Sequence, residues 1–169
     1  MHMIRVSQLL FLSGVLLSGV VAPASAQSRS RSLAALATTR TRSDSVDVQA
    51  AMTGFLDALN ELDVPRMSAD FADDITAFVP SAQVDRVEGK AAVTAIFSAF
   101  ANRGKTAPRA TSVPDDMRIE VSGSLAIVHF MVHDAPPKPT RRRTFVWRKV
   151  GKRWLISHFH ASDIASPAR

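Results

Sequence analysis

The stretch "WRKVGKRWLISHFHASD", Trp147–Asp163, contains two apolar segments separated by Gly151-Lys152. Strand-like segments on either side of so short a glycine-containing connection are typical of a β-hairpin. His158 and His160 lie two residues apart in the second segment, so they share one face of its strand. The stretch therefore predicts two adjacent antiparallel strands with a histidine pair on one sheet face.

Strand patterns continue upstream of this hairpin. Two more strands, "MRIEV" and "LAIVHFMVHD", are joined by a short turn, and the Pro-rich segment "APPKPT" connects them to "RRTFVWRKV", which includes the first strand of the hairpin. In the first half of the chain, apolar residues instead recur at steps of three and four, which is typical of amphipathic helices. The predicted helices cover 45–62, with Ser45 as N-cap, then 63–71 and 89–102, and "ITAFVPS" with "QVDRV" predicts a small hairpin. Helices that cover one face of an antiparallel sheet form an α+β fold.

The N-terminal 43 residues have a different composition. An apolar run, Leu9–Val21, follows Arg5 and precedes Ala24-Ser25-Ala26, which predicts a secretory signal peptide over residues 1–26. The run is shorter than the roughly 20 apolar residues that cross a bilayer. Residues 27–43 are basic and rich in Ser, Ala and Thr, which predicts a flexible linker before a domain at 44–165. We expect export to the periplasm or medium, with no membrane span after cleavage.

Composition and missing motifs exclude several functions. The chain has no cysteine, and its net charge of +6 derives mostly from the leader and the linker. Lys138 and Arg141–Arg143 are expected to be a solvated hairpin end, and no stacking aromatics accompany them, so we expect no nucleic acid. No P-loop, dinucleotide fingerprint, G-x-S-x-G or H-E-x-x-H motif occurs. We therefore expect no cofactor.

Four segments, in this order, resemble the nuclear transport factor 2-like (NTF2-like) superfamily, and most closely its SnoaL-like members: "FLDALNELD", "FADDITAFVP", "VEGKAAVTAIFSAF" and "TFVWRKVGKRWLISHFHASD". The last is also similar to the association (hub) domain of calcium/calmodulin-dependent kinase. The resemblance covers about Val46–Ser162. It implies a cone, in which a strongly curved sheet wraps on helices and encloses a mostly apolar pocket, and a homodimer formed through the sheet.

The resemblance also places residues at the sites of relatives. The oxyanion-binding tyrosine and the general base of ketosteroid isomerase fall on Phe55 and Val79, so this chain lacks both groups on which that chemistry depends. Two pocket arginines of the hub domain fall on Phe145 and Ala161, which argues against an anion site. The implied wall is apolar, although the same side chains could simply fill the core. The candidates are Phe55, Leu59, Phe78, Phe97, Val128, Phe130, Val132, Phe145 and Phe159.

Metal binding by the histidines is not expected. The strand that carries His129 and His133 is two strand spacings, about 10 Å, from the strand of His158 and His160, whereas zinc holds nitrogen ligands at about 2.0–2.1 Å. The strand between them, from Arg142 to Val150, offers no good ligand. A histidine pair on the outer sheet face, where a partner subunit could pack, is the preferred interpretation.

The length of one turn decides which face carries the histidines. A two-residue loop at Gly151-Lys152 pairs Phe145 with His158, whereas a three-residue loop pairs it with Ser157. The hub resemblance favours the longer loop, which turns the histidines away from the pocket. With the shorter loop, His158 becomes the best general-base candidate, and Asp74 is the other weak catalytic candidate, as a residue that orients a pocket water.

Three functional hypotheses follow. The preferred one is an exported domain that binds a small apolar or amphipathic molecule without a committed reaction. The second is a cofactor-independent isomerase, cyclase or hydrolase that uses His158 or Asp74. The third is an oligomerisation module that acts through the sheet surface.

Overall fold

The computed structural model describes residues 24–80, 85–104, 111–133 and 140–164. The chain divides into two units, residues 1–35 and residues 36–169. The expected signal peptide lies, except for its last three residues, outside the described residues, as does most of the Pro-rich connection. No helix in the described part of the chain is long and apolar enough to cross a membrane.

Helix α1 runs from Ala24 to Glu61. It includes residues 27–43, so the expectation of a flexible linker is wrong there, and so is that of Ser45 as an N-cap. The physical reason is local: no glycine or proline interrupts the chain from Ala24 to Thr53, and Ala and Arg are good helix formers. Only from Val48 onward does the predicted apolar stripe become continuous, with Val48, Met52 and Phe55 fully buried.

The remaining elements follow the predicted order with small shifts at their ends. Asp63 caps α2 through its side chain, which accepts a hydrogen bond from the backbone N–H of Arg66 at 3.1 Å. Phe71 begins a strand rather than ending this helix. The elements are α2 Val64–Ala69, β1 Phe71–Phe78, β2 Val87–Glu88, α3 Lys90–Gly104, β3 Asp115–Ser122, β4 Leu125–Val132, β5 Thr140–Val150 and β6 Arg153–Ile164.

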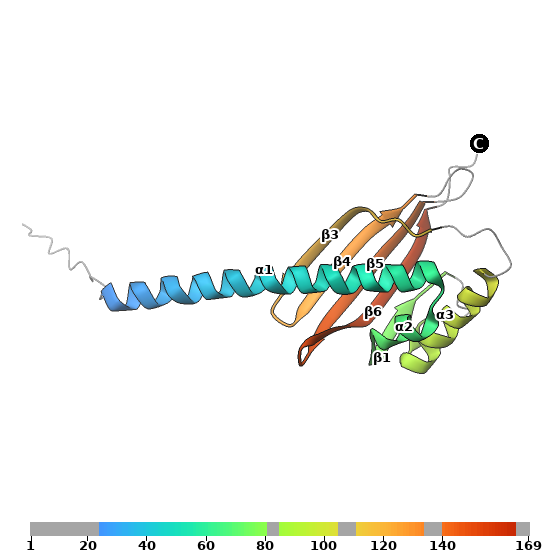
Figure 1. Ribbon diagram of the computed structural model, residues 1–169, viewed down its shortest axis with the longest axis horizontal. Helices are drawn as coiled ribbons and strands as arrows, with labels where there is room; N and C mark the ends of the chain where they lie inside the picture. The colour runs from blue at the N-terminus through green and yellow to red at the C-terminus, as the bar shows by residue number, and fades with distance from the viewer. Residues whose placement is uncertain (1–23, 81–84, 105–110, 134–139, 165–169) are drawn as a thin grey trace, which may run out of the picture. The chain divides into compact units, whose positions relative to one another are not determined.

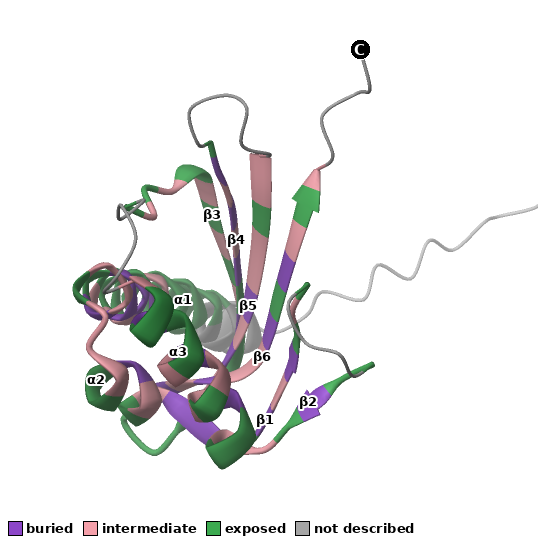
Figure 2. Cartoon of the chain, turned by 90° about the vertical axis from the view of Figure 1, so that its right-hand side faces the viewer, coloured by how far each residue is buried: buried purple, intermediate pink, exposed green. Residues whose placement is uncertain are grey.

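The six strands form one curved sheet in the order β2-β1-β6-β5-β4-β3 (Figure 1). Within residues 36–169 the helices lie on one face of this sheet (Figure 2), which confirms the α+β fold. One detail differs from the prediction: β1 pairs with β6 in parallel, so the sheet is mixed rather than antiparallel throughout. The chain passes through α3 to the far edge at β3 and returns strand by strand, so β6 reaches β1 in the same direction.

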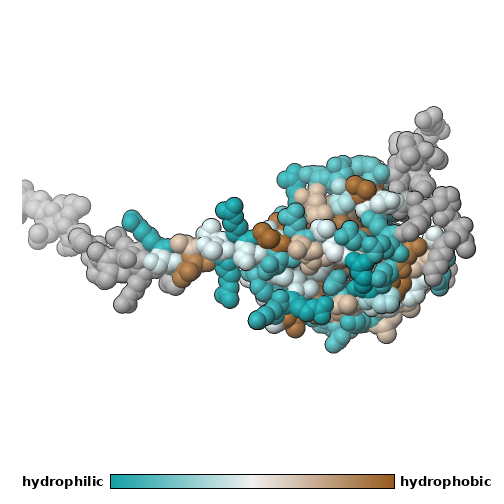
Figure 3. Space-filling model, viewed as in Figure 1, coloured by the Kyte–Doolittle hydropathy of each residue, from teal (hydrophilic) through white to brown (hydrophobic). Residues whose placement is uncertain are grey.

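The core lies between the helices and the concave face of the sheet. Phe55 of α1 lies at its centre, with ring centroids 6.0 Å from Phe71, 5.9 Å from Phe97 and 5.4 Å from Phe145. Trp147 is the largest fully buried side chain of the described residues. On the side seen in Figure 3, hydrophobic residues are scattered among hydrophilic ones. This agrees with the burial of the large apolar side chains in the core.

The hairpin between β5 and β6 contains the shorter of the two predicted loops together with a β-bulge. Val150 pairs with Arg153 across Gly151-Lys152, and Gly151 has a φ of 61° that favours glycine. Farther along, Trp147 pairs with Ile156 but Val146 pairs with His158, so Ser157 is the extra residue. The Ser157 hydroxyl donates to the carbonyl oxygen of Val146 at 3.2 Å.

The bulge decides the orientation of every later residue of β6. Phe145 pairs with Phe159, whereas the two loop lengths considered from the sequence paired it with His158 or Ser157. Both of those pairings are wrong. The extra residue nevertheless turns His158 and His160 to the face opposite Phe145 and Phe159, as was expected from the longer loop.

Candidate functional site: an arginine-rimmed apolar pocket

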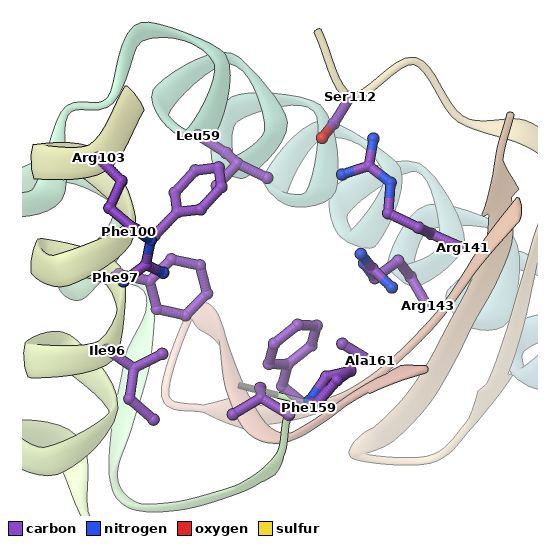
Figure 4. A pocket seen from close by; sticks show the side chains of 12 residues that line it. Leu59, Ile96, Phe97, Phe100, Arg103, Ser112, Arg141, Arg143, Phe159 and Ala161 are labelled. Atoms are coloured by element: carbon purple, nitrogen blue, oxygen red, sulfur yellow. The ribbon is translucent and has the colours of Figure 1, made fainter. Parts of the chain in front are cut away.

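A pocket of about 140 Å³ lies between α3, the C-terminal turn of α1 and the inner face of β5 and β6 (Figure 4). Leu59, Phe97 and Phe159, all predicted wall residues, line it. The Phe97 and Phe159 rings lie 5.9 Å apart at its base. The full lining comprises Leu59, Val79, Pro80, Ile96, Phe97, Phe100, Arg103, Ser112, Arg141, Arg143, Phe159 and Ala161.

A smaller void of about 30 Å³ shares several of these residues and extends toward the core. Four further predicted wall residues line it: Phe55, Phe130, Val132 and Phe145. Their rings are closely packed, with Phe145 stacked on Phe159 at 4.8 Å and on Phe130 at 5.9 Å. The inner part of the predicted cavity is therefore largely filled by protein, and most of the open space of this cavity lies near α3.

Two of the predicted wall residues do not line either space. Val128 is fully buried in the core. Phe78 is 42 % exposed and lies on the opposite, outer face of the sheet, so its assignment to the pocket wall is wrong. Its ring lies 5.3 Å from that of His158 and 6.1 Å from that of His160, because Phe78 pairs with His160 across the parallel strands.

Arginines form the polar side of the pocket. Arg141 and Arg143 lie two residues apart on β5, so they share the inner face with Phe145. The expectation of a solvated hairpin end is therefore wrong for these two arginines. Strand alternation counted back from Phe145 was the signal that could have located them. Arg103, in the last turn of α3, is the third lining arginine and lies across the pocket from these two, beside Phe97 and Phe100 (Figure 4).

Ser112 lines the pocket because Asn60 holds its backbone. The Asn60 side-chain oxygen accepts from the Ser112 N–H at 2.8 Å, and its amide nitrogen donates to the Ser112 carbonyl at 3.4 Å. This pair of bonds links the end of α1 to the segment before β3. The sequence did not predict this role for Asn60 or Ser112. The two residues are far apart in the chain, so no local pattern indicates that they are hydrogen-bonded.

His158 lies on the outer face, away from the pocket. Its Nδ1 lies 2.8 Å from the Thr76 hydroxyl oxygen on β1. Burial, with a smaller contribution from nearby His160, lowers the pKa of His158 below its usual 6.5. The geometry therefore gives this histidine a structural contact and does not bring it to the pocket.

The shifted pKa predicts an acid sensitivity. Because the folded protein disfavours the imidazolium, its stability falls as pH decreases below about 6.5, the usual value in an unfolded chain. The His158→Gln variant removes this contribution, so its melting temperature should fall less than that of the wild type between pH 7.5 and 5. Thermal melts across this range measure the difference. Equal losses in the two proteins would contradict the prediction.

Asp74, the other catalytic candidate, forms an ion pair on the outer face. Its two carboxylate oxygens accept from Arg148, with Arg148 Nη1 3.1 Å from Oδ2. The hydrogen bonds from this guanidinium are the main reason that the pKa of Asp74 is lowered. Asp74 lines neither the pocket nor its inner extension, so it does not orient a pocket water.

No group of three or more His, Asp or Glu side chains within the described residues is placed to hold a metal ion.

A curved mixed sheet that packs on helices around an apolar pocket defines an NTF2-like α+β domain. Residues 48–167, most of the chain, match the model of the SnoaL-like domain. The chain therefore belongs to the SnoaL-like family.

Solved structures confirm the fold. An NTF2-like protein of unknown function from Pseudomonas putida KT2440 is 23% identical, with 72% of this chain and 87% of that chain covered and a TM-score of 0.60. A putative dehydratase of the NTF2-like family from Streptomyces avermitilis is 17% identical, with 74% and 99% covered and a TM-score of 0.63. A putative calcium/calmodulin-dependent protein kinase type II association domain from Thiobacillus denitrificans is 22% identical, with 69% and 94% covered and a TM-score of 0.58. No protein of curated function is detectably similar in sequence.

Proposed function

We propose that this SnoaL-like domain binds a small apolar or amphipathic molecule in the pocket between α3 and the sheet, without a cofactor. The observation that carries the proposal is an open space of about 140 Å³ with an apolar base and a polar rim. Cavities of about 150 Å³ bind benzene, whereas drug-sized ligands occupy roughly 300–1,000 Å³. The size favours a ligand with about one ring and a short substituent.

Thermal melting in the presence of 2-phenylethanol tests this proposal. A ligand that binds only the folded state raises the melting temperature, by a free energy of about 2.7 kcal/mol at one hundred times its dissociation constant. Ile96 lines the pocket and is only partly buried, so Ile96→Trp should fill the space without disrupting the core. Val46, 61 % exposed on α1 and outside the pocket, supplies the matched control Val46→Trp.

We expect the ligand to stabilise the wild type and Val46→Trp but not Ile96→Trp. Equal stabilisation of all three proteins would mean that the alcohol binds elsewhere. No stabilisation of the wild type by 2-phenylethanol or its charged analogues would contradict the proposed function.

Binding is preferred to catalysis because of where the candidate bases lie. His158 and Asp74 are on the outer face, and the described lining residues of the pocket include no histidine and no carboxylate. A cofactor-independent isomerase, cyclase or hydrolase needs such a group within hydrogen-bond reach of its substrate. Similarity to a putative dehydratase does not supply one, because it rests on the fold alone.

A homodimer through the outer sheet face is a second proposal. Phe78, Leu125 and Ile127 are 42 %, 49 % and 43 % exposed there, and Val146, which pairs with Ile127 across the strands, adds to the apolar surface. Exposed apolar patches of this kind mark protein interfaces. A second copy of the chain, which presents the same patch, is the proposed occupant.

Light scattering coupled to size-exclusion chromatography tests the dimer. The Ile127→Glu variant places a charge in the proposed interface and should elute as a monomer, whereas the wild type elutes as a dimer. Val113→Glu changes a side chain that is 65 % exposed outside the sheet and should remain dimeric. A monomeric wild type would refute the proposal.

Export is proposed on the composition of residues 1–26. The intact mass of the protein, purified from a bacterial periplasm or medium after expression of the full chain, should correspond to an N-terminus at Gln27. A cytoplasmic protein that retains residues 1–26 would contradict export.

A further inference from the structure

Resting on the proposed function, we propose that the pocket selects small carboxylates with an apolar body. In this arrangement Arg141 and Arg143 bind the carboxylate, and the body packs against Phe97, Phe100 and Phe159. The proposal differs from the sequence-based expectation, in which apolar residues at the positions of the hub arginines argued against an anion site. Here the arginines come from other positions of β5.

The first support is the direction of the side chains. Figure 4 shows the guanidinium groups of Arg141 and Arg143 pointing into the pocket from the β5 side, with the rings of Phe97 and Phe100 from α3 across from them. The Ser112 hydroxyl lies on the same side as Arg141. A molecule with an anionic end and an apolar end matches these two sides of the space.

The second support is the charge of the lining. Three arginines, but no aspartate or glutamate, are found among the described lining residues. Asp163 lies outside the lining, 44 % exposed, with its Oδ1 3.9 Å from Arg143 Nη1, at the limit of an ion pair. Cationic ligands should therefore be disfavoured and anions favoured.

The third support is preorganisation of Arg143. Its side chain is 17 % exposed, and its Nη1 donates to the carbonyl oxygens of Arg142 at 2.7 Å and Ser162 at 3.3 Å. These bonds hold the guanidinium group through its Nη1. A planar guanidinium matches a carboxylate geometrically, and partial burial strengthens such charge-assisted bonds relative to those on an exposed surface.

Calorimetric titrations with phenylacetate, 2-phenylethanol and 2-phenylethylamine test the inference, since these probes share a skeleton and differ in charge. For the wild type we expect phenylacetate to bind at least about tenfold more tightly than the alcohol, and the amine most weakly. The Arg141→Met and Arg143→Met variants should lose most of the tenfold preference and still bind the alcohol. Arg142→Met is the matched control, because Arg142 lies between them on β5 and faces outward.

The outcomes distinguish a failure of ligand binding in the pocket from a failure of carboxylate selection. If none of the three probes binds, the proposed function itself fails. If the alcohol binds as tightly as phenylacetate, or if Arg142→Met lowers the preference as much as Arg141→Met, the pocket is a binding site but not a carboxylate site. Should Arg143→Met not fold, as judged by circular dichroism, Arg141→Met decides the outcome alone.

Discussion

Replacing Trp147 by alanine should lower the free energy of unfolding by about 3–5 kcal/mol, a large part of the roughly 5–15 kcal/mol of a typical domain. Trp147 has no exposed surface and lies in the middle of β5, paired with Ala126 on one side and Ile156 on the other. Its removal leaves a cavity in the core that these small or rigid neighbours cannot close. Urea unfolding measures the loss.

Two controls separate the cavity from other effects. The Trp147 Nε1 is buried and has no hydrogen-bond partner among the described atoms, so Trp147→Phe should cost only about 1–2 kcal/mol, for lost volume. Val150→Ala, at the exposed end of the same strand, should change stability by less than about 0.5 kcal/mol. A loss below 1 kcal/mol in Trp147→Ala would show that this part of the core is not packed as described.

The second large effect concerns an ion pair that links α1 to the sheet. Among the residues whose exposure is described, Asp44 is the only charged residue that is buried, with 5 % of its surface exposed. Its carboxylate accepts a hydrogen bond from the Lys149 ammonium on β5. Lys149 also lies 5.5 Å from the centre of the Trp154 ring. Removal of one partner of a fully buried pair costs about 3–5 kcal/mol. Because the Lys149 side chain is 28 % exposed, we expect about 2–3 kcal/mol for Lys149→Met.

A double variant distinguishes a stranded charge from lost packing. Asp44→Leu combined with Lys149→Met removes both charges, so its free energy of unfolding should recover most of the loss of Lys149→Met alone. Urea unfolding of the two single variants and the double variant gives the coupling energy. Additive losses would show that the two side chains do not interact in solution.

Sequence patterns located the elements of the fold because most of them rest on local periodicity. The apolar stripe of α1, the alternation of β4 and β5 and the Gly151 turn are all visible in short windows. The parallel contact between β1 and β6 is not visible in this way, since it joins strands more than 70 residues apart. From the sequence, a linker rather than a helix is predicted before Ser45, because the basic, Ser-, Ala- and Thr-rich composition of this segment is given more weight than the intrinsic helix propensity of its residues.

The site was predicted in part. Of the predicted wall residues, Leu59, Phe97 and Phe159 line the pocket, but the register of β6 depends on a bulge at Ser157 that no local pattern marks. Without that bulge, strand alternation would place His158 on the same sheet face as the buried Ile156. Arg141 and Arg143 were missed for a different reason: a run of basic residues was interpreted as one solvated cluster, although alternate members of a strand face opposite sides.

The central claim is that the pocket beside α3, and not the outer sheet face, receives an apolar ligand. Methyl NMR spectra of protein with labelled Ile, Leu and Val, recorded during a titration with 2-phenylethanol, test it most directly. We predict that the methyl signals of Leu59, Val79 and Ile96, which line the pocket, shift as the alcohol is added. Shifts confined to Leu125, Ile127 and Leu155 on the outer face, or no shifts at all, would contradict the account.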